Sequence, residues 1–553
     1  MPLATPDILS EEFDVCIVGA GPGGLACAFA CHDQGLKVLV LDAGGERPIP
    51  GSPDILAAEI TNTNAHDPVE IVAAAALGGS SHWWGGRCIA LDPVDFRNWP
   101  ITWEEMLPWW RRAAELVGAG LLVEEAAPGE FANLAQFDAR PAECWAPQRV
   151  LSRHWRQRLR NASGPAILLG ARVVGLNHAN GSITSVDVST PAGNRQVRTP
   201  RLVLSCGGLG TMRLMLLAQR SAPYLFGGRG GPLGRGYMGH LTGSIADLVF
   251  NNRQHARAFN IFRADAGCLA RRRIVPRSRT VESNAIPNVA FWIENPAQGS
   301  ARHGSAAASA RYLAAYAVRR FAKRLNGQAP PPLQPHFANV ARAPWTAVTG
   351  LTSAAWGLAT ARVAPQTYLP PGYLSSGANG WRLVYHSEQF SDPSNRVTLS
   401  EEKDSAGLPK LHIDFRFGDR DVDGVVRAHA LLDRDLQEAG AGRLRWTNDD
   451  PQSLVAAAAR DGYHQIGGTI MGAKSSASVV DLQCRVHGLN NMWVASSSVF
   501  PTSGQANPTL TIIAMGCRVA EQVARSAKRE LTAAPSMPVP QTGAAATSGQ
   551  PAT

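Results

Sequence analysis

Short apolar segments and turns alternate at the start of the chain. Residues 14–18 form an apolar run, a glycine turn follows, and residues 23–34 form a longer, mostly apolar run. A second short apolar run, residues 37–41, ends at Asp42. Short apolar runs bounded by turns predict buried strands, and a longer run between them predicts a helix. The pattern therefore predicts a strand–helix–strand unit.

Polar and apolar residues alternate between residues 171 and 205, with turn residues at 179–181 and 191–193. Such alternation predicts half-buried strands, and asparagine, glycine and proline between them predict tight turns. We therefore expect an antiparallel meander that ends in a buried strand, 201–205.

Further elements are predicted toward the C-terminus. Alternation predicts strands at 395–399 and 410–417, and the spacing of apolar residues predicts helices over 421–439 and 507–525. The composition then turns to alanine, proline, threonine, glycine and glutamine. Residues 530–553 are therefore predicted to form a disordered tail.

The middle of the chain, residues 243–383, is the least patterned part. It contains a predicted helix, 306–325. One face of this helix is apolar, with Leu313, Tyr316, Ala317 and Phe321, and the opposite face carries arginines. We interpret it as an amphipathic helix with a solvated basic face. A helix that binds a membrane surface or a partner is the alternative.

Composition is typical of a globular enzyme with more than one domain. The chain has 553 residues, of which 45% are hydrophobic and 18% charged. No apolar run approaches the roughly 20 residues that cross a bilayer. Residues 1–13 hold acidic but no basic side chains, unlike a signal peptide, so we expect a cytoplasmic protein without a membrane span. The nine cysteines form no CxxC pair, which predicts reduced thiols and neither disulfides nor a metal site.

The formal net charge of +9 raises the question of a nucleic-acid partner. The arginines are scattered, with small clusters at 271–273 and 319–324, and aromatic residues do not alternate with them. Proteins that bind single strands combine a basic track with stacking aromatic residues. We therefore expect no nucleic-acid partner.

The first motif with chemical meaning is Gly19-Ala20-Gly21-Pro22-Gly23-Gly24, which lies between the first strand and the helix. Gly19 permits a tight turn, Gly21 lets the backbone approach a pyrophosphate, and Gly24 lets the helix pack closely on the strand. The helix N-terminus favours the phosphate charge, and Asp42 ends the second strand, where a carboxylate accepts from a ribose hydroxyl. The motif predicts a dinucleotide site, which either FAD or NAD would satisfy.

The second motif is Leu77-Gly78-Gly79-Ser80-Ser81-His82-Trp83-Trp84-Gly85-Gly86-Arg87. Two glycine pairs around hydroxyl and aromatic residues let the backbone lie flat against a planar group with its N–H donors exposed. An irregular loop around a structural tryptophan is the alternative interpretation.

The third motif is a C-terminal block that begins near His464 and extends to Thr509. Within it, Asn507 precedes Pro508, and a capping side chain followed by proline at the first helical position predicts a helix start. The N-terminus of that helix would carry partial positive charge. Taken singly, His464 would also suit a structural role, and Asn507 would suit a helix cap alone.

Together these motifs resemble those of the glucose–methanol–choline (GMC) oxidoreductases, and the resemblance covers nearly the whole chain. Four stretches carry it: residues 19–24, 77–87, 203–214 and 464–511. Shorter stretches are similar to a bacterial branch of the family that acts on sugars and glycosides: residues 233–240, and 388–389 with 395–399.

The resemblance implies a mixed α/β fold. A Rossmann-like FAD-binding domain with a β-meander would be formed by residues 10–242 and 476–528. A substrate domain built on an antiparallel sheet would be formed by residues 243–475, so that the two domains are interleaved in the sequence.

The resemblance also implies a catalytic pair, His464 and Asn507. In the family, the matching histidine lies in front of the flavin N5, with a histidine or asparagine beside it. An alcohol yields its hydride as its hydroxyl proton leaves, so His464 would be the base. Asn507 would hold the substrate oxygen, and the helix from Pro508 would stabilise negative charge on the flavin. His240 and His487 are expected to be structural.

FAD is the implied cofactor, and the family pattern assigns its contacts to Gly19, Gly21, Gly24, Asp42, Gly79, Ser80, Trp84, Gly85, Arg87, Val173, Ser498, Pro508 and Thr509. Some relatives attach FAD covalently through a histidine four residues beyond the second glycine of the loop. That position is Trp83 here, and His82 falls one residue short. Noncovalent FAD is therefore favoured, with a link through His82 as the alternative.

The implied function is FAD-dependent oxidation of an alcohol such as a sugar, glycoside or polyol, with oxygen or another electron acceptor. Two alternatives stay open. One is a non-redox lyase of the same fold that retains FAD, and the other is a flavin subunit of a larger dehydrogenase complex.

Overall fold

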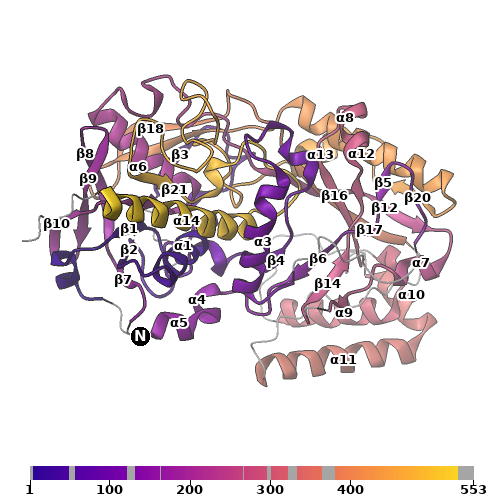
Figure 1. Ribbon diagram of the computed structural model, residues 1–553. Coiled ribbons are helices and arrows are strands. Elements are labelled where there is room, and N and C mark those ends of the chain that lie inside the picture. Colours follow the sequence, from indigo (N-terminus) through magenta and orange to yellow (C-terminus); the bar gives the residue numbers. More distant parts are fainter. Residues whose placement is uncertain are drawn as a thin grey trace, which may run out of the picture.

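The fold combines a parallel sheet and an antiparallel sheet that lie on opposite sides of the molecule (Figure 1). The computed structural model describes residues 4–48, 56–120, 131–161, 163–265, 267–295, 301–321, 333–363 and 380–533. The mixed α/β class expected from the sequence is confirmed.

The parallel sheet has the strand order β21-β11-β1-β2-β7, and all of its neighbouring pairs are parallel. Its strands are β1 (Val15–Val18), β2 (Val38–Asp42), β7 (Ala166–Leu169), β11 (Leu202–Leu204) and β21 (Met492–Val494). β1 and β2 are buried along their whole length, as expected of parallel strands that are covered on both faces. The helix between them is α1 (Pro22–Asp33), so the predicted strand–helix–strand unit is confirmed.

Helix α14 (Thr509–Ala533) crosses the parallel sheet and packs against α1 and α3 (Trp103–Val117) (Figure 1). The strand order reverses at β1, with β2 on one side and β11 on the other. Ligands of such sheets bind at the carboxyl ends of the strands where the order reverses. The glycine motif follows β1 at this point.

The predicted meander is confirmed as the antiparallel sheet β10-β9-β8. Its strands are β8 (Arg172–Ala179), β9 (Ser182–Thr190) and β10 (Gly193–Arg198). Asn180 and Gly181 turn the chain between β8 and β9 with φ angles of 50° and 71°. Asparagine and glycine tolerate this left-handed region, which tight hairpin turns require.

The large antiparallel sheet has the order β16-β17-β12-β20. Its strands are β12 (His240–Phe250), β16 (Val289–Glu294), β17 (Gly380–Glu388) and β20 (Gly442–Trp446). Helices α12 (Asp419–Glu438) and α13 (Pro451–Ala458) pack against it. The exact boundaries expected for the two domains stay a prediction.

The predicted strands near residues 395 and 410 are confirmed as β18 (Arg396–Lys403) and β19 (Pro409–Asp414), which form a sheet with β3 (Ala58–Ile60). Another small sheet has the order β13-β14-β6-β4. Its strands are β4 (Arg87–Cys88), β6 (Ala142–Trp145), β13 (Phe262–Arg263) and β14 (Leu269–Arg272). The remaining elements are α2 (Val69–Val72), β5 (Phe137–Asp138), α4 (Leu151–His154), α5 (Arg156–Arg160), α6 (Gly207–Ser221), α7 (Arg253–Arg257), β15 (Val275–Pro276), α8 (Ser278–Asn284), α9 (Ala306–Phe321), α10 (Gln334–Arg342) and α11 (Pro344–Val363).

The C-terminal helix is longer than the sequence indicated. The expected tail began at residue 530, but residues 530–533 belong to α14. The buried guanidinium of Arg201 forms an ion pair with Glu530, which holds this last turn against the sheet. Residues 534–553 of the expected tail lie outside the described residues, as do residues 322–325 of the helix predicted over 306–325.

A buried cluster of charged side chains lies within the small sheet of β4, β6 and β14. The Glu143 carboxylate on β6 is fully buried and lies 2.5 Å from the Arg271 guanidinium and 3.3 Å from that of Arg273. Arg87 is 3.9 Å from the same carboxylate. Burial alone would raise the pKa of Glu143, but these guanidinium groups lower it to about 2 from the ordinary 4.5.

Glu143→Gln is expected to lower the free energy of unfolding at neutral pH by about 3 kcal/mol, because it leaves buried cations without their carboxylate. The pKa of Glu143 is lower in the folded chain, so its contribution is complete above about pH 5 and is lost as the pH falls toward 2. The difference between wild type and variant in chemical denaturation should therefore shrink over that range. Glu402→Gln, at an exposed carboxylate paired with Lys410, is the control and should change little at any pH. Equal stability of Glu143→Gln and wild type at neutral pH would contradict the assignment.

Candidate active site

A cavity of about 530 Å³ lies at the carboxyl ends of β1 and β2, next to the start of α14. It is lined by both candidate catalytic residues, His464 and Asn507. Most of the expected cofactor residues also line it, namely Gly19, Gly21, Asp42, Gly79, Ser80, Trp84, Gly85, Arg87, Val173, Pro508 and Thr509. The structure thus brings together residues that are up to 490 positions apart in the chain.

The glycine turn leaves backbone open to the cavity. A Cβ atom added at Gly21 would have no neighbour closer than 4.0 Å, whereas one added at Gly19 would lie 2.5 Å from the Ser205 carbonyl oxygen. Gly21 is also the residue before the first turn of α1, where backbone N–H groups are free to bind an anion. The turn therefore has both the room and the donors that a pyrophosphate requires.

Asp42 shapes this turn as well as bordering the cavity. Its carboxylate accepts hydrogen bonds from the backbone N–H groups of Ala20, at 2.7 Å, and Gly44, at 2.8 Å. Burial raises the pKa of Asp42, and these two hydrogen bonds oppose the rise. Each oxygen keeps a lone pair, so the expected bond to a ribose hydroxyl stays a prediction.

Two expected cofactor residues do not line the cavity. A Cβ added at Gly24 would lie 1.9 Å from the Gly19 carbonyl oxygen, so Gly24 serves the packing of α1 on β1. Ser498 is fully buried and accepts a hydrogen bond from the Thr469 hydroxyl at 2.7 Å. Its neighbours Ser496 and Ser497 line the cavity in its place.

The loop of the second motif folds over the cavity through residues in the left-handed region, Gly78 and Gly79, whose φ angles are 94° and 52°. Trp83 lines the cavity. His82 is not among the lining residues, and its Nε2 lies 3.1 Å from the Leu77 carbonyl oxygen. The imidazole therefore points back to its own loop.

His464 and Asn507 are in direct contact across the cavity wall. The Asn507 Nδ2 atom lies 3.3 Å from the His464 Nε2 atom. His464 is positioned by its loop, since Ile466 forms a backbone bridge to Met238 and Asp461 forms one to His66. Asn507 comes from the segment that enters α14, so its amide points at the imidazole and serves as more than a helix cap.

Asp461 lies behind His464 and was missed in the sequence. Its carboxylate accepts from the His464 Nδ1–H at 2.9 Å, and it also accepts from the backbone N–H groups of His240, Gly462 and Tyr463. Burial would raise the pKa of Asp461, but the neighbouring imidazoles and these N–H groups hold it well below its usual range. An ionised Asp461 keeps the proton of His464 on Nδ1, so Nε2 presents a lone pair toward Asn507 and the cavity. The signal in the sequence that could have indicated this role is the position of Asp461, three residues before His464.

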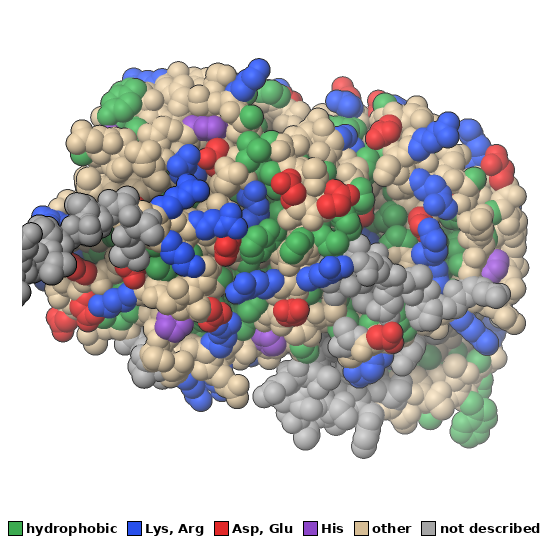
Figure 2. All heavy atoms as spheres, in the orientation of Figure 1, with side chains coloured by type: hydrophobic (Ala, Val, Ile, Leu, Met, Phe, Trp, Pro, Cys, Tyr) green, Lys and Arg blue, Asp and Glu red, His purple; other side chains and the backbone are tan. Residues whose placement is uncertain are grey.

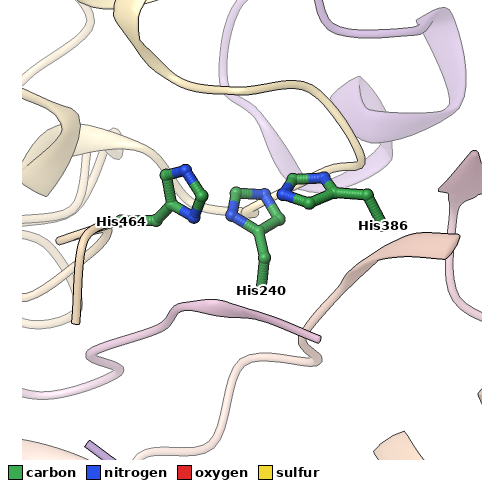
Figure 3. Close-up of side chains that lie close together, drawn as sticks. All are labelled: His240, His386 and His464. Carbon is green, nitrogen blue, oxygen red and sulfur yellow. The ribbon is translucent and has the colours of Figure 1, made fainter. Parts of the chain in front are cut away.

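Two further buried histidines pack against His464 (Figure 3). His240 and His386 are stacked with ring centroids 4.3 Å apart, and His464 meets them edge-on at 4.6 Å and 5.4 Å. Burial and the neighbouring imidazoles lower the pKa of both well below 6.5, so both are neutral. We assign no metal ion to the three rings, because both nitrogens of His464 already contact Asp461 and Asn507.

The two histidines expected to be structural differ in position. His240 is buried against His464, whereas His487 contacts Ser478 and the Gly472 carbonyl oxygen and does not line the cavity. The cavity joins the glycine turn to the His464 imidazole and the Asn507 carboxamide. A glycine turn between a parallel strand and a helix, opening on such a cavity, is typical of a dinucleotide-binding enzyme.

Comparisons with known proteins agree with this class. The GMC oxidoreductase family model matches residues 391–516, and the NAD(P)-binding Rossmann-like domain model matches residues 17–47. The 2-methyl-1,2-propanediol dehydrogenase of Mycolicibacterium austroafricanum is 23% identical over 595 residues, which cover 93% of this chain and 96% of that protein. These comparisons support the resemblance to the GMC oxidoreductase family that the sequence motifs carry.

Other relatives match over shorter stretches. The fructose dehydrogenase large subunit of Gluconobacter japonicus is 30% identical over 153 residues, 28% of this chain and 26% of that protein. The C-glycoside 3-oxidase of Microbacterium trichothecenolyticum is 33% identical over 133 residues, 24% of each chain. Among solved structures, pyridoxine 4-oxidase from Mesorbium loti is similar with a TM-score of 0.51 at 17% identity, covering 92% of this chain and 99% of that chain. This similarity supports the fold.

Proposed function

We propose that the protein oxidises an alcohol with noncovalently bound FAD, and that His464 removes the hydroxyl proton. The observation that carries this proposal is the chain of contacts Asp461–His464–Asn507 at the cavity. FAD, when bound, supplies the acceptor for the hydride. The groove formed by Gly21, Ser80 and Thr509 would hold it, and the orientation of His82 away from the cavity favours a noncovalent complex.

Each polar side chain at the end of the cavity has a defined task. His464 Nε2 carries the lone pair that accepts the hydroxyl proton, and ionised Asp461 stabilises the imidazolium that forms. The Asn507 amide donates to the substrate oxygen and fixes the direction of its carbinol C–H bond. The backbone N–H groups at the start of α14 would stabilise negative charge on the bound flavin.

A sugar, glycoside or polyol is the proposed substrate class. The relatives named above include a diol dehydrogenase, a fructose dehydrogenase subunit and a glycoside oxidase. Each of these classes offers a carbinol, and its oxidation requires a base for the hydroxyl proton and a hydrogen-bond donor for the oxygen. His464 and Asn507 would supply them.

An anaerobic screen of flavin reduction against glycosides, free sugars, polyols, sterols and simple alcohols tests the proposal. Bleaching of the yellow protein by members of the first three classes is the expected result. A flavin that stays oxidised with every alcohol would overturn it and would favour a lyase that retains FAD.

Asn507→Ala is expected to slow flavin reduction by roughly 10- to 100-fold, because the substrate oxygen loses the donor that orients it. Stopped-flow absorbance of the flavin under anaerobic conditions measures the rate. Asn507→His restores an N–H donor at the same place and should recover most of the rate. If Asn507→Ala reduced as fast as wild type, the amide would serve only the start of α14.

A further inference from the structure

The positive charge of the chain is concentrated in one segment. The protein has 53 Lys and Arg residues and 44 Asp and Glu residues. Nine of the basic residues and none of the acidic ones lie between residues 295 and 387, so the rest of the chain is balanced at 44 of each. The whole formal net charge of +9 therefore comes from this segment.

The described part of that segment includes three helices, α9, α10 and α11, which form a layer at the lower edge of the molecule in Figure 1. α11 packs on α9 through small residues: a Cβ added at Gly350 would lie 2.5 Å from the Cβ of Ala307. Ala306, Ala310 and Ala347 form the buried cluster of this layer. The side of α11 that carries Ala347 and Gly350 is thus the inner side.

The outer side of the layer exposes large apolar side chains. Trp345, Val348 and Leu351 follow one another at three-residue spacing on α11 and are 82%, 51% and 40% exposed. Phe337 on α10 is 58% exposed. These four are half of the large apolar side chains that are exposed among the described residues. Figure 2 shows hydrophobic side chains at the lower right, near these helices.

Basic and apolar groups lie next to each other on this layer. Arg342 ends α10, is exposed, and precedes Trp345 by three residues. From Pro344 to Ala361 the sequence of α11 has no charged residue. Of the described helices, none is long and apolar enough to span a bilayer. A helix that lies flat on a membrane surface, by contrast, requires only one apolar side and nearby cations.

We propose that the outer side of α10 and α11, formed by Phe337, Arg342, Trp345, Val348 and Leu351, docks on the surface of an anionic phospholipid bilayer. Tryptophan and leucine bury their side chains at the level of the headgroups, where aromatic rings are favoured. Arg342 lies on this side and is exposed, and a cation at a membrane surface is attracted to anionic headgroups by about 1 kcal/mol. Residues 295–387 carry basic but no acidic side chains, which is complementary to the negative charge of the headgroups. On α11, uncharged threonines separate Trp345, Val348 and Leu351.

Sedimentation of the full-length flavoprotein with vesicles tests this proposal. Vesicles of phosphatidylcholine containing phosphatidylglycerol should bind the protein at low salt, and vesicles of phosphatidylcholine alone should bind it much more weakly. The double variant Trp345→Ser/Leu351→Ser is expected to lower binding at least tenfold, and Arg342→Glu by about fivefold or more. Tyr224→Ser removes a side chain that is 71% exposed but lies outside this layer, so it should bind like wild type.

Flavin content and the rate of flavin reduction should be unchanged in all of these variants, because none of the replaced residues lines the cavity. Those measurements separate loss of docking from loss of folding. The proposal is overturned if wild type fails to sediment with anionic vesicles, or if the folded double variant binds them as well as wild type. A soluble complex with an acidic protein or with a second copy of the chain, without vesicle binding, would likewise overturn it.

Discussion

His464→Ala is expected to slow anaerobic flavin reduction by about 10³-fold while the flavin stays bound. The His464 imidazole lines the cavity, and the ionised Asp461 carboxylate holds its Nδ1 so that Nε2 faces Asn507 and the cavity. Without the imidazole, the hydroxyl proton has no acceptor in place, and the carbinol C–H bond does not yield its hydride readily. The flavin should remain because its expected contacts lie along the groove in the glycine turn, the second motif and the start of α14.

His464→Gln serves as a second test of the base in that experiment, and His412→Ala serves as its control. Glutamine keeps a polar side chain of similar length but cannot take up the proton at neutral pH, so it should be about as slow as alanine. His412 contacts Thr61 and is remote from the cavity, so its replacement should leave the rate unchanged. A rate for His464→Ala near that of wild type would show that another group is the base.

Asp461→Asn is expected to slow flavin reduction by about 100-fold, with FAD still bound. The carboxamide oxygen would keep the hydrogen bonds from Gly462 and Tyr463, which turns its NH₂ group toward His464 Nδ1 and toward the His240 backbone N–H. Nδ1 would then accept, and the imidazole proton would move to Nε2, where the lone pair is needed. The variant would thus carry the wrong tautomer of His464, and the His240 N–H would lose its acceptor.

The rate measured over a range of pH tests this role. His464 is surrounded by Asp461, His240 and His386, and the two histidines stay neutral because burial keeps their pKa well below 6.5. Asp461→Asn removes the anionic contact that His464 has among these neighbours, so the imidazolium that forms in the reaction is less stabilised and the rate should fall at every pH. A wild-type rate in the variant would mean that Asp461 only holds the loop.

Local features of the fold could be predicted from the sequence because their signals lie within short windows. The unit of β1, α1 and β2 and the meander of β8 to β10 follow from alternation and turn residues. The contact between His464 and Asn507 was expected only through the family resemblance, since nothing local joins residues 43 positions apart.

The histidines behind His464 could not be predicted. His386 lies opposite Thr242 in the pairing of β12 with β17, two residues beyond His240. That register brings together residues 146 positions apart, and it depends on long-range pairing rather than on any local pattern.

The inner face of α9 was predicted only in part. Of the residues expected on its apolar face, Ala317 is exposed, Leu313 and Tyr316 are half-buried, and the side chain of Phe321 lies outside the described part, whereas the buried apolar positions are Ala306 and Ala310. Alanines pack here because α11 approaches closely at Gly350. A search for bulky residues overlooks such an interface, since small side chains carry little hydrophobic signal.

The stacked pair of His240 and His386 belongs to strands of the antiparallel sheet, whereas Asn507 lies just before the helix that crosses the parallel sheet. In the proposed mechanism, nucleotide binding therefore depends on the parallel sheet, and proton transfer depends on the packing of β12 and β17 behind His464. Substitutions in β12 and β17 are expected to change the reaction without changing FAD binding.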